Sequence, residues 1–98
     1  MASDHIHELK TWPEPFAAMV DGTKTFEYRH DDRGYRIGDV LLLREWDPAV
    51  FHPIARYTGR TLRVRVTYVL HGGRFGVPDG YVVMGVKPET TPTQEQDR

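Results

Sequence analysis

The chain has 98 residues, 39% of them hydrophobic, which predicts a single domain with one modest core. It has no cysteine, which excludes disulfides and thiolate zinc sites and favours a cytoplasmic location. The formal net charge of −1 argues neither for nor against binding to nucleic acid. No apolar run approaches the roughly 20 residues of a membrane helix, and the N-terminus lacks a signal-peptide layout.

A short strand and a helix are predicted first. Residues 5–9 read as a strand, and residues 13–21 read as a helix with Thr11 as a possible N-cap and prolines in its first turn. Gly22 then acts as a C-terminal stop. The apolar residues of this segment share helical spacing and form one stripe: Trp12, Phe16, Met19 and Val20.

The next segments predict two strands joined by a glycine-containing loop. Residues 25–30 alternate, which places Phe26 and Tyr28 on the core face and Glu27 with Arg29 on the opposite face. Residues 31–39 read as a loop. Residues 40–46 form the most apolar run of the chain and predict a central strand.

The second half predicts two more strands. Residues 47–57 have no period and read as a variable loop and a candidate cleft lid, followed by a turn at Thr58 and Gly59. Residues 61–70 form a long strand, and residues 81–86 form the last one. The tail, residues 88–98, has no large apolar side chain and is predicted to be disordered, so the domain covers residues 1–87.

One or two short helices and about five strands in so short a chain predict a mainly β, α+β fold, a small closed or nearly closed barrel. Closure would protect the strand edges. The long strand is expected to turn alternate residues inward, from Leu62 through Tyr68 to Leu70. The expected core comprises Phe16, Phe26, Tyr28, Leu42, Val64, Val66 and Val83.

Charge is unevenly distributed along the chain. Residues 29–74 carry a net charge of +4, against −3 for residues 1–28 and −2 for residues 75–98. Ten of the 13 basic residues are arginines, which suit bidentate phosphate contacts. Lys24, Glu27 and Arg29 fall within six residues, and together they offer two cations and one acceptor to a ligand. The alternative is that Glu27 and Arg29 pair on a solvated face, where such pairs contribute about 0–1 kcal/mol.

Five motifs in order carry a resemblance that covers nearly all of residues 7–86. They are H-x-L-K-x-W-P-x-x-F, G-x-K-T-F-E-x-R, D-R-G-Y-R-x-G-D-x-L-x-L-x-E-W, Y-T-G-R and G-Y-V-V-M. In these the chain resembles the ASCH-like domains of the PUA superfamily and, more narrowly, a family of small bacterial and phage proteins known as a domain of unknown function.

The resemblance implies a PUA-like β-barrel with a helix closing one side and a cleft lined by Lys24 and Arg29. ASCH domains are thought to bind RNA, and some relatives are amidohydrolases that act on a modified cytidine. Those enzymes have a threonine, the supposed nucleophile, three residues after the lysine. Here that position is Glu27, so their chemistry does not carry over.

Four more residues are candidate ligand contacts. Tyr35 and Arg36 would stack on a base, and Arg60, at the tip of the predicted turn, would contact a phosphate. Trp46 is either a core residue or a stacking platform. His5 and His7 form an H-x-H pair without a third metal ligand of convincing spacing, so neither metal nor cofactor is predicted.

Two function classes remain open. The first is a module that binds RNA, a nucleotide or a modified nucleoside through Lys24, Glu27 and Arg29. The second is a small hydrolase acting on a nucleoside or RNA, with Glu27 as general base, Lys24 assisting it and both cations stabilising charge. A third, weaker reading is a structural protein without a ligand. No membrane partner is predicted, and the oligomeric state is left open.

Overall fold

The computed structural model describes residues 5–51 and 56–89, and in these it has five strands and one helix. The strands form one sheet in the order β1-β3-β4-β5-β2, in which β1 runs parallel to β3 and every other neighbouring pair is antiparallel. The elements in chain order are β1 (Ile6–Thr11), α1 (Pro13–Val20), β2 (Phe26–His30), β3 (Val40–Trp46), β4 (Tyr57–His71) and β5 (Tyr81–Pro88).

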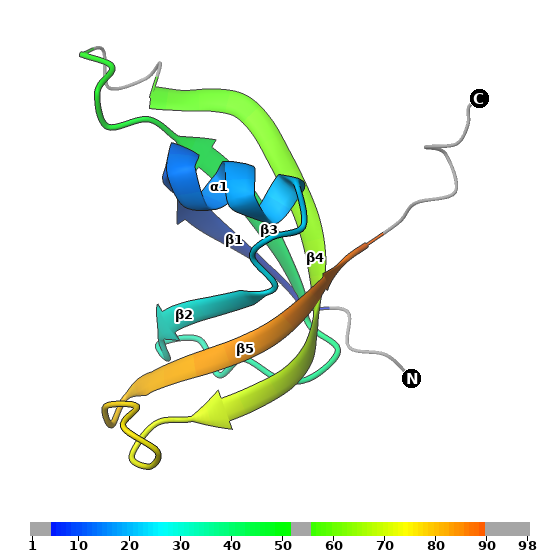
Figure 1. Cartoon of the computed structure of the whole chain (residues 1–98), viewed down its shortest axis with the longest axis vertical. Coiled ribbons are helices and arrows are strands. Elements are labelled where there is room, and N and C mark those ends of the chain that lie inside the picture. The colour runs from blue at the N-terminus through cyan, green and yellow to red at the C-terminus, as the bar shows by residue number, and fades with distance from the viewer. Residues whose placement is uncertain (1–4, 52–55, 90–98) are drawn as a thin grey trace.

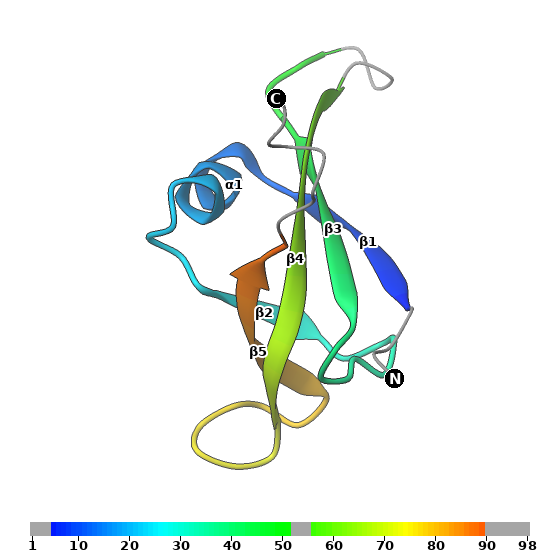
Figure 2. The same cartoon turned by 90° about the vertical axis from the view of Figure 1, so that its right-hand side faces the viewer.

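The sheet curls into a half-barrel, with α1 on its concave side (Figures 1 and 2). The fold is therefore mainly β with one short helix, as the sequence predicts at that level. Side chains from β2 and from the loop after it reach the edge strand β1: Arg29 Nη2 of β2 donates to the carbonyl oxygen of Lys10 at 3.2 Å, and Arg33 Nη1 of the loop donates to that of Glu8 at 3.1 Å. We call this junction between β1 and β2 the seam.

The core lies between α1 and the concave face of the sheet. Phe16 and Met19 are the buried residues of α1, and β3, β4 and β5 supply most of the rest. The two prolines suit the first helical turn because their missing N–H groups are not needed there. The strand and loop residues of the core cluster are Leu9, Tyr35, Leu41, Leu43, Val64, Val66, Val82, Met84 and Val86.

The predicted ends of α1 and β3 agree closely with the structure. Strand β3 has the predicted bounds, and α1 ends one residue earlier than expected, followed by Gly22 at a φ of 87°. Such a positive φ favours glycine just after a helix. The predicted N-cap is wrong, because Thr11 is a buried residue of β1 and Trp12 occupies the cap position without a side-chain bond.

The predicted turn at Thr58 and Gly59 is also wrong, because β4 runs through both residues. Residues 58–60 stand opposite the single Glu45, since Arg44 pairs with Thr61 and Trp46 with Tyr57. Gly59, at a φ of 92°, accommodates this irregularity, which lets the strand continue instead of reversing.

A second irregularity changes the predicted inward face of β4. The register shifts between Val66 and Tyr68 against β5, so the side-chain alternation changes phase there. Val64 and Val66 are buried as expected, but Tyr68 is 61% exposed, and Val69 packs against the core in its place.

Strand β2 has the opposite orientation to the predicted one. Phe26 and Tyr28 are about half exposed, whereas Glu27 is only 2% exposed. Among the other expected core residues, Leu42 and Val83 are only partly buried, because each faces away from the helix. The alternation of β2 is therefore as predicted, but the opposite face of the strand is buried.

The sheet extends slightly beyond the predicted domain boundary. Pro88 belongs to β5, and the backbone N–H of Glu89 donates to the carbonyl of Arg63 at 2.9 Å. Residues 90–98 of the predicted tail, and residues 52–55 of the predicted lid, lie outside the described residues. No helix in the described residues is long and apolar enough to cross a membrane.

Candidate functional site: a charged pocket at the seam

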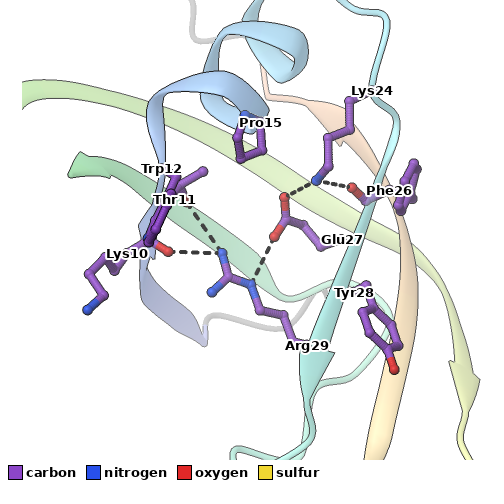
Figure 3. Close-up of a pocket in the computed structure, with 9 residues that line it drawn as sticks. All are labelled: Lys10, Thr11, Trp12, Pro15, Lys24, Phe26, Glu27, Tyr28 and Arg29. Atoms are coloured by element: carbon purple, nitrogen blue, oxygen red, sulfur yellow. Dashed lines mark hydrogen bonds and ion pairs between the residues drawn. The ribbon is translucent and has the colours of Figure 1, made fainter. Parts of the chain in front are cut away.

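A pocket of about 290 Å³ opens between the end of β1, the start of α1 and strand β2. Its lining comes from three segments, residues 10–12 with Pro15, Lys24, and residues 26–29 (Figure 3). We call it the seam pocket. It brings the predicted trio of Lys24, Glu27 and Arg29 together at one hollow.

Glu27 holds the two cations of the seam pocket in place. Its Oε2 accepts a hydrogen bond from Lys24 Nζ at 2.8 Å, and its Oε1 accepts one from Arg29 Nε at 2.9 Å. Both cationic side chains are partly exposed, at 20% and 24%, while the Glu27 side chain is 3% exposed. A carboxylate so deeply buried is tolerable because it is paired and hydrogen-bonded on both oxygens.

Arg29 connects the two sides of the pocket. Its Nη2 donates to the carbonyl oxygen of Lys10 and, at 3.4 Å, to the hydroxyl of Thr11, so one side chain spans from β2 to β1 (Figure 3). No acceptor among residues 5–51 and 56–89 takes a hydrogen bond from its Nη1. That nitrogen is available to a ligand.

Lys24 reaches the pocket from the segment that leaves α1. Its backbone N–H donates to the carbonyl of Ala18 at 3.0 Å, which fixes the exit from the helix. Its Nζ donates to Glu27 and also to the carbonyl oxygen of Phe26 at 2.7 Å. Lys24 is thus fixed at both its backbone and its ammonium group, and little side-chain freedom remains to be lost on binding.

Aromatic side chains border the pocket near the helix start. The rings of Trp12 and Trp46 are 6.3 Å apart between centroids, and Lys10 Nζ lies 4.2 Å from the Trp46 ring centroid. Trp12 is 55% exposed, so much of its indole is accessible. Trp12 lines the pocket, whereas Trp46 contacts Trp12 and does not line the pocket itself.

Tyr35 is not at the pocket, contrary to the predicted stacking role. It is 3% exposed and belongs to the core cluster, with the His7 ring against it edge-on at 4.9 Å. Burial raises the pKa of the Tyr35 hydroxyl above its ordinary value. A side chain packed in this way cannot stack on a ligand without repacking the core.

Arg36 and Arg60 also lie away from the seam pocket. Arg36 is exposed, and its backbone N–H donates to Asp39 Oδ2 at 3.0 Å, which shapes the loop before β3. The Arg60 guanidinium lies 5.1 Å from the Phe16 ring centroid and 3.5 Å from Glu45 Oε1. Arg60 therefore covers the outer side of the core.

The sequence reasoning missed the β1 side of the pocket. Four of the residues that line this side fall within the first of the five motifs: Lys10, Thr11, Trp12 and Pro15. The motif itself was therefore the available signal, although periodicity assigned Trp12 to the buried helix stripe. In residues 5–51 and 56–89, no three His, Asp or Glu side chains gather into a group that could hold a metal ion.

Comparison with known protein families assigns the chain to one of them. Residues 6–86 match the model of a domain of unknown function, DUF3850. The chain belongs to this family. The match begins with β1 and ends within β5, so the DUF3850 region contains both sides of the seam and the whole pocket. It agrees with the narrower of the two resemblances in the sequence.

A phage protein is similar to this DUF3850 chain. The "uncharacterized 12.9 kDa protein in GpA 3'region" of Escherichia phage P2 is 41% identical over 64 residues. The aligned segment covers 65% of this chain and 53% of the phage protein. The chain thus spans about half the length of that curated relative.

Proposed function

We propose that the chain is a binding module for one nucleotide, free or exposed within an RNA strand, and that the seam pocket is its binding site. The observation that carries this proposal is the arrangement of Lys24 and Arg29 on the two oxygens of buried Glu27. It presents two fixed cations side by side at the wall of one hollow. A rigid pair of this kind suits a phosphate or a base carbonyl.

The charge of the pocket favours an anionic ligand. Lys24 and Arg29 carry two positive charges against the single acidic residue of the lining, Glu27, while the Lys10 side chain is directed away from Glu27, over the Trp46 ring (Figure 3). Arg29 also has its unbonded Nη1 to offer as a charge-assisted donor. The fixed cations are already ordered by Glu27, so a ligand would not have to order them.

The apolar part of the lining favours a base attached to that anion. Trp12, Pro15 and Phe26 border the same hollow as the charges. Exposed aromatic rings stack on nucleobases with little sequence preference. A volume of about 290 Å³ is near the lower end of small-ligand pockets and suits one nucleotide.

Binding without hydrolysis is favoured by the state of Glu27. A general base needs an oxygen directed at the proton it removes. Both Glu27 oxygens already accept from cations, and the side chain is nearly inaccessible. Glu27 is better suited to positioning Lys24 and Arg29 than to taking a proton from a ligand.

The likeness to ASCH-like domains of the PUA superfamily is part of this proposal. It is supported by the order of the five motifs and by a curled sheet with a helix on its concave side. We also propose a cytoplasmic location, which the lack of cysteine favours.

The proposal is tested by titrating the protein with nucleoside monophosphates and short RNAs while following turnover in parallel. Arg29→Ala should weaken binding roughly ten- to a hundredfold, because a charge-assisted contact is lost. Lys24→Ala should weaken binding and reduce its salt dependence. Glu27→Gln should also weaken binding, because the amide NH2 group cannot accept a hydrogen bond and one of the two cations loses its partner.

Arg74→Ala is a matched control, because Arg74 lies in the loop between β4 and β5, outside the pocket lining. It should bind like the wild type. A hydrolase would instead turn over a ligand and lose about 10²–10⁴-fold in rate with Glu27→Gln while still binding. If all three pocket variants bound every nucleotide and RNA as tightly as the wild type, the three charged side chains would take no part in binding.

A further inference from the structure

The outer face of the sheet, opposite α1, has two exposed aromatic residues on either side of a glycine. In the strand register both Phe26 of β2 and Tyr68 of β4 are partners of Gly85 in β5. Phe26 is 47% exposed and Tyr68 is 61% exposed. We call the group of Phe26, Gly85 and Tyr68 the aromatic slot.

The β-bulge in β4 places Tyr68 on this face. Without the register shift after Val66, continued alternation would turn Tyr68 toward the core with Val64 and Val66. Bulges commonly redirect a side chain next to a functional site. Exposing a tyrosine in this way forgoes the burial of a large side chain, so the fold gains no packing from it.

Gly85 has no side chain of its own on the floor of the slot, and Thr67 borders that floor. An added Cβ at Gly85 would lie 3.2 Å from Thr67 Oγ1, which is a tight contact, and 3.6 Å from Tyr68 Cβ, which is an ordinary one. Neighbouring strands are about 4.8 Å apart, which puts the backbones of Phe26 and Tyr68 about 10 Å apart across Gly85. That spacing leaves room for one planar ring between their side chains.

Cations stand on both sides of the slot. Lys24 Nζ, which belongs to the seam pocket, lies 4.9 Å from the Phe26 ring centroid, and Figure 3 shows this ring turned away from Glu27. On the other side, the cross-strand partners Arg65 and Lys87 line a hollow of about 380 Å³ with Thr67 and Glu89. Arg65 already donates to Glu89 Oε2 and to the carbonyl oxygen of Gly38, so Lys87 is the cation that this hollow offers to a ligand.

Phe26 connects the slot with the seam pocket, because it lines the pocket and is also the register partner of Gly85. We propose that the aromatic slot is a second nucleobase subsite and that the ligand is a single-stranded nucleic acid of two or more nucleotides. One nucleotide occupies the seam pocket, the next base stacks in the slot, and a following phosphate lies near Lys87. This inference rests on the proposed function of the seam pocket.

The test compares hexanucleotides with single nucleotides. Wild-type protein is titrated with rA, rU, rC and dT hexamers and with the matching monophosphates, using fluorescence anisotropy for labelled hexamers and calorimetry for monophosphates. We expect at least one hexamer to bind more tightly than its monophosphate. Tyr68→Ala should weaken hexamer binding roughly ten- to a hundredfold and leave the monophosphate unaffected. The ribose and deoxyribose arms decide between RNA and DNA.

Three further variants sharpen the result. Tyr68→Trp should retain hexamer affinity, because the stacking surface is kept. Phe51→Ala removes a 96% exposed aromatic outside the slot and should behave as wild type. Lys87→Ala should reduce the slope of log affinity against log salt by about one for hexamers only. Thermal unfolding confirms that each variant is folded.

Failure of this inference is distinguishable from failure of the proposed function. If monophosphates bind through Arg29 but hexamers bind no more tightly, or if Tyr68→Ala leaves hexamer binding unchanged, the second subsite is overturned and the seam pocket stands. If neither ligand binds, both proposals are overturned. If Tyr68→Ala alters the sedimentation of the ligand-free protein, the slot is occupied by a second copy of the chain and the subsite is again overturned.

Discussion

Strands β2 and β4 alternate with the same period, yet they turn opposite kinds of side chain toward the helix. In β4 the buried residues include Val64 and Val66. In β2 the buried residue is Glu27, and its aromatic neighbours Phe26 and Tyr28 are about half exposed. A charged interior and an apolar exterior are therefore found on one strand, beside strands with the usual arrangement.

The difference follows from where the two strands lie. Strand β4 is central, between β3 and β5, so its inward residues contact the core on all sides. Strand β2 is an edge strand at the seam, where its inward side meets Lys24, the β1 backbone and the open pocket. A carboxylate at this position accepts hydrogen bonds from Lys24 and Arg29, which a valine would leave unsatisfied. We conclude that the inverted strand is built around the pocket.

The largest effect on stability is expected from Glu27→Ala. Removing the carboxylate leaves the Lys24 and Arg29 charges unpaired at a site where water has limited access. Removing one partner of a buried ion pair costs about 3–5 kcal/mol, and since both cations are partly exposed we expect about 2–3 kcal/mol in the free energy of unfolding. Urea denaturation measures the change.

Glu89→Ala is the matched control on the β4 side of the comparison. Glu89 pairs with Arg65 and lies 3.8 Å from Arg63, and both arginines are more than a third exposed. We expect at most about 1 kcal/mol of destabilisation. If Glu27→Ala and Glu89→Ala lowered the free energy of unfolding equally, the seam charges would behave as a surface ion pair and not as a buried one.

A smaller difference is expected from truncating the apolar residues of the two strands. Val64→Ala removes two methyl groups from a fully buried position and should destabilise the fold by about 2 kcal/mol. Phe26→Ala removes a larger side chain, but one that is half exposed, and should cost less than about 1 kcal/mol. The same urea assay compares them. If Phe26→Ala were the more damaging change, β2 would have the orientation that its alternation first suggested.

The parts of the fold that the sequence predicts well are those governed by local chemistry. Strand β3 was predicted at Val40–Trp46 from one apolar run, and α1 from helical spacing followed by Gly22. In both segments the apolar pattern and the turn residues agree with the burial that results.

The phase of β2 could not be predicted, because alternation states which residues share a face and not which face is buried. The choice depends on Lys24 and on the β1 carbonyl of Lys10, which are supplied by other segments. The bulge after Val66 could not be predicted for a similar reason, because it is defined by the pairing of β4 with β5.

The candidate site was predicted in part. Lys24, Glu27 and Arg29 do converge: strand spacing placed Glu27 and Arg29 on one face, and the family motif indicated Lys24. Tyr35 was misplaced, because an aromatic residue beside an arginine in a loop reads as a surface residue, whereas the loop folds it under His7. Sequence spacing alone does not reveal such a tertiary contact.

The central claim is that the seam pocket binds a nucleotide, and amide chemical-shift mapping tests it most directly. Uniformly ¹⁵N-labelled protein is titrated with nucleoside monophosphates, and the shifts of each backbone amide and of the Trp12 indole N–H are followed. The account predicts that the largest saturable shifts fall in residues 10–12 and 26–29 and at the Trp12 indole. Saturable shifts clustered elsewhere, or none at any concentration reached, would contradict it.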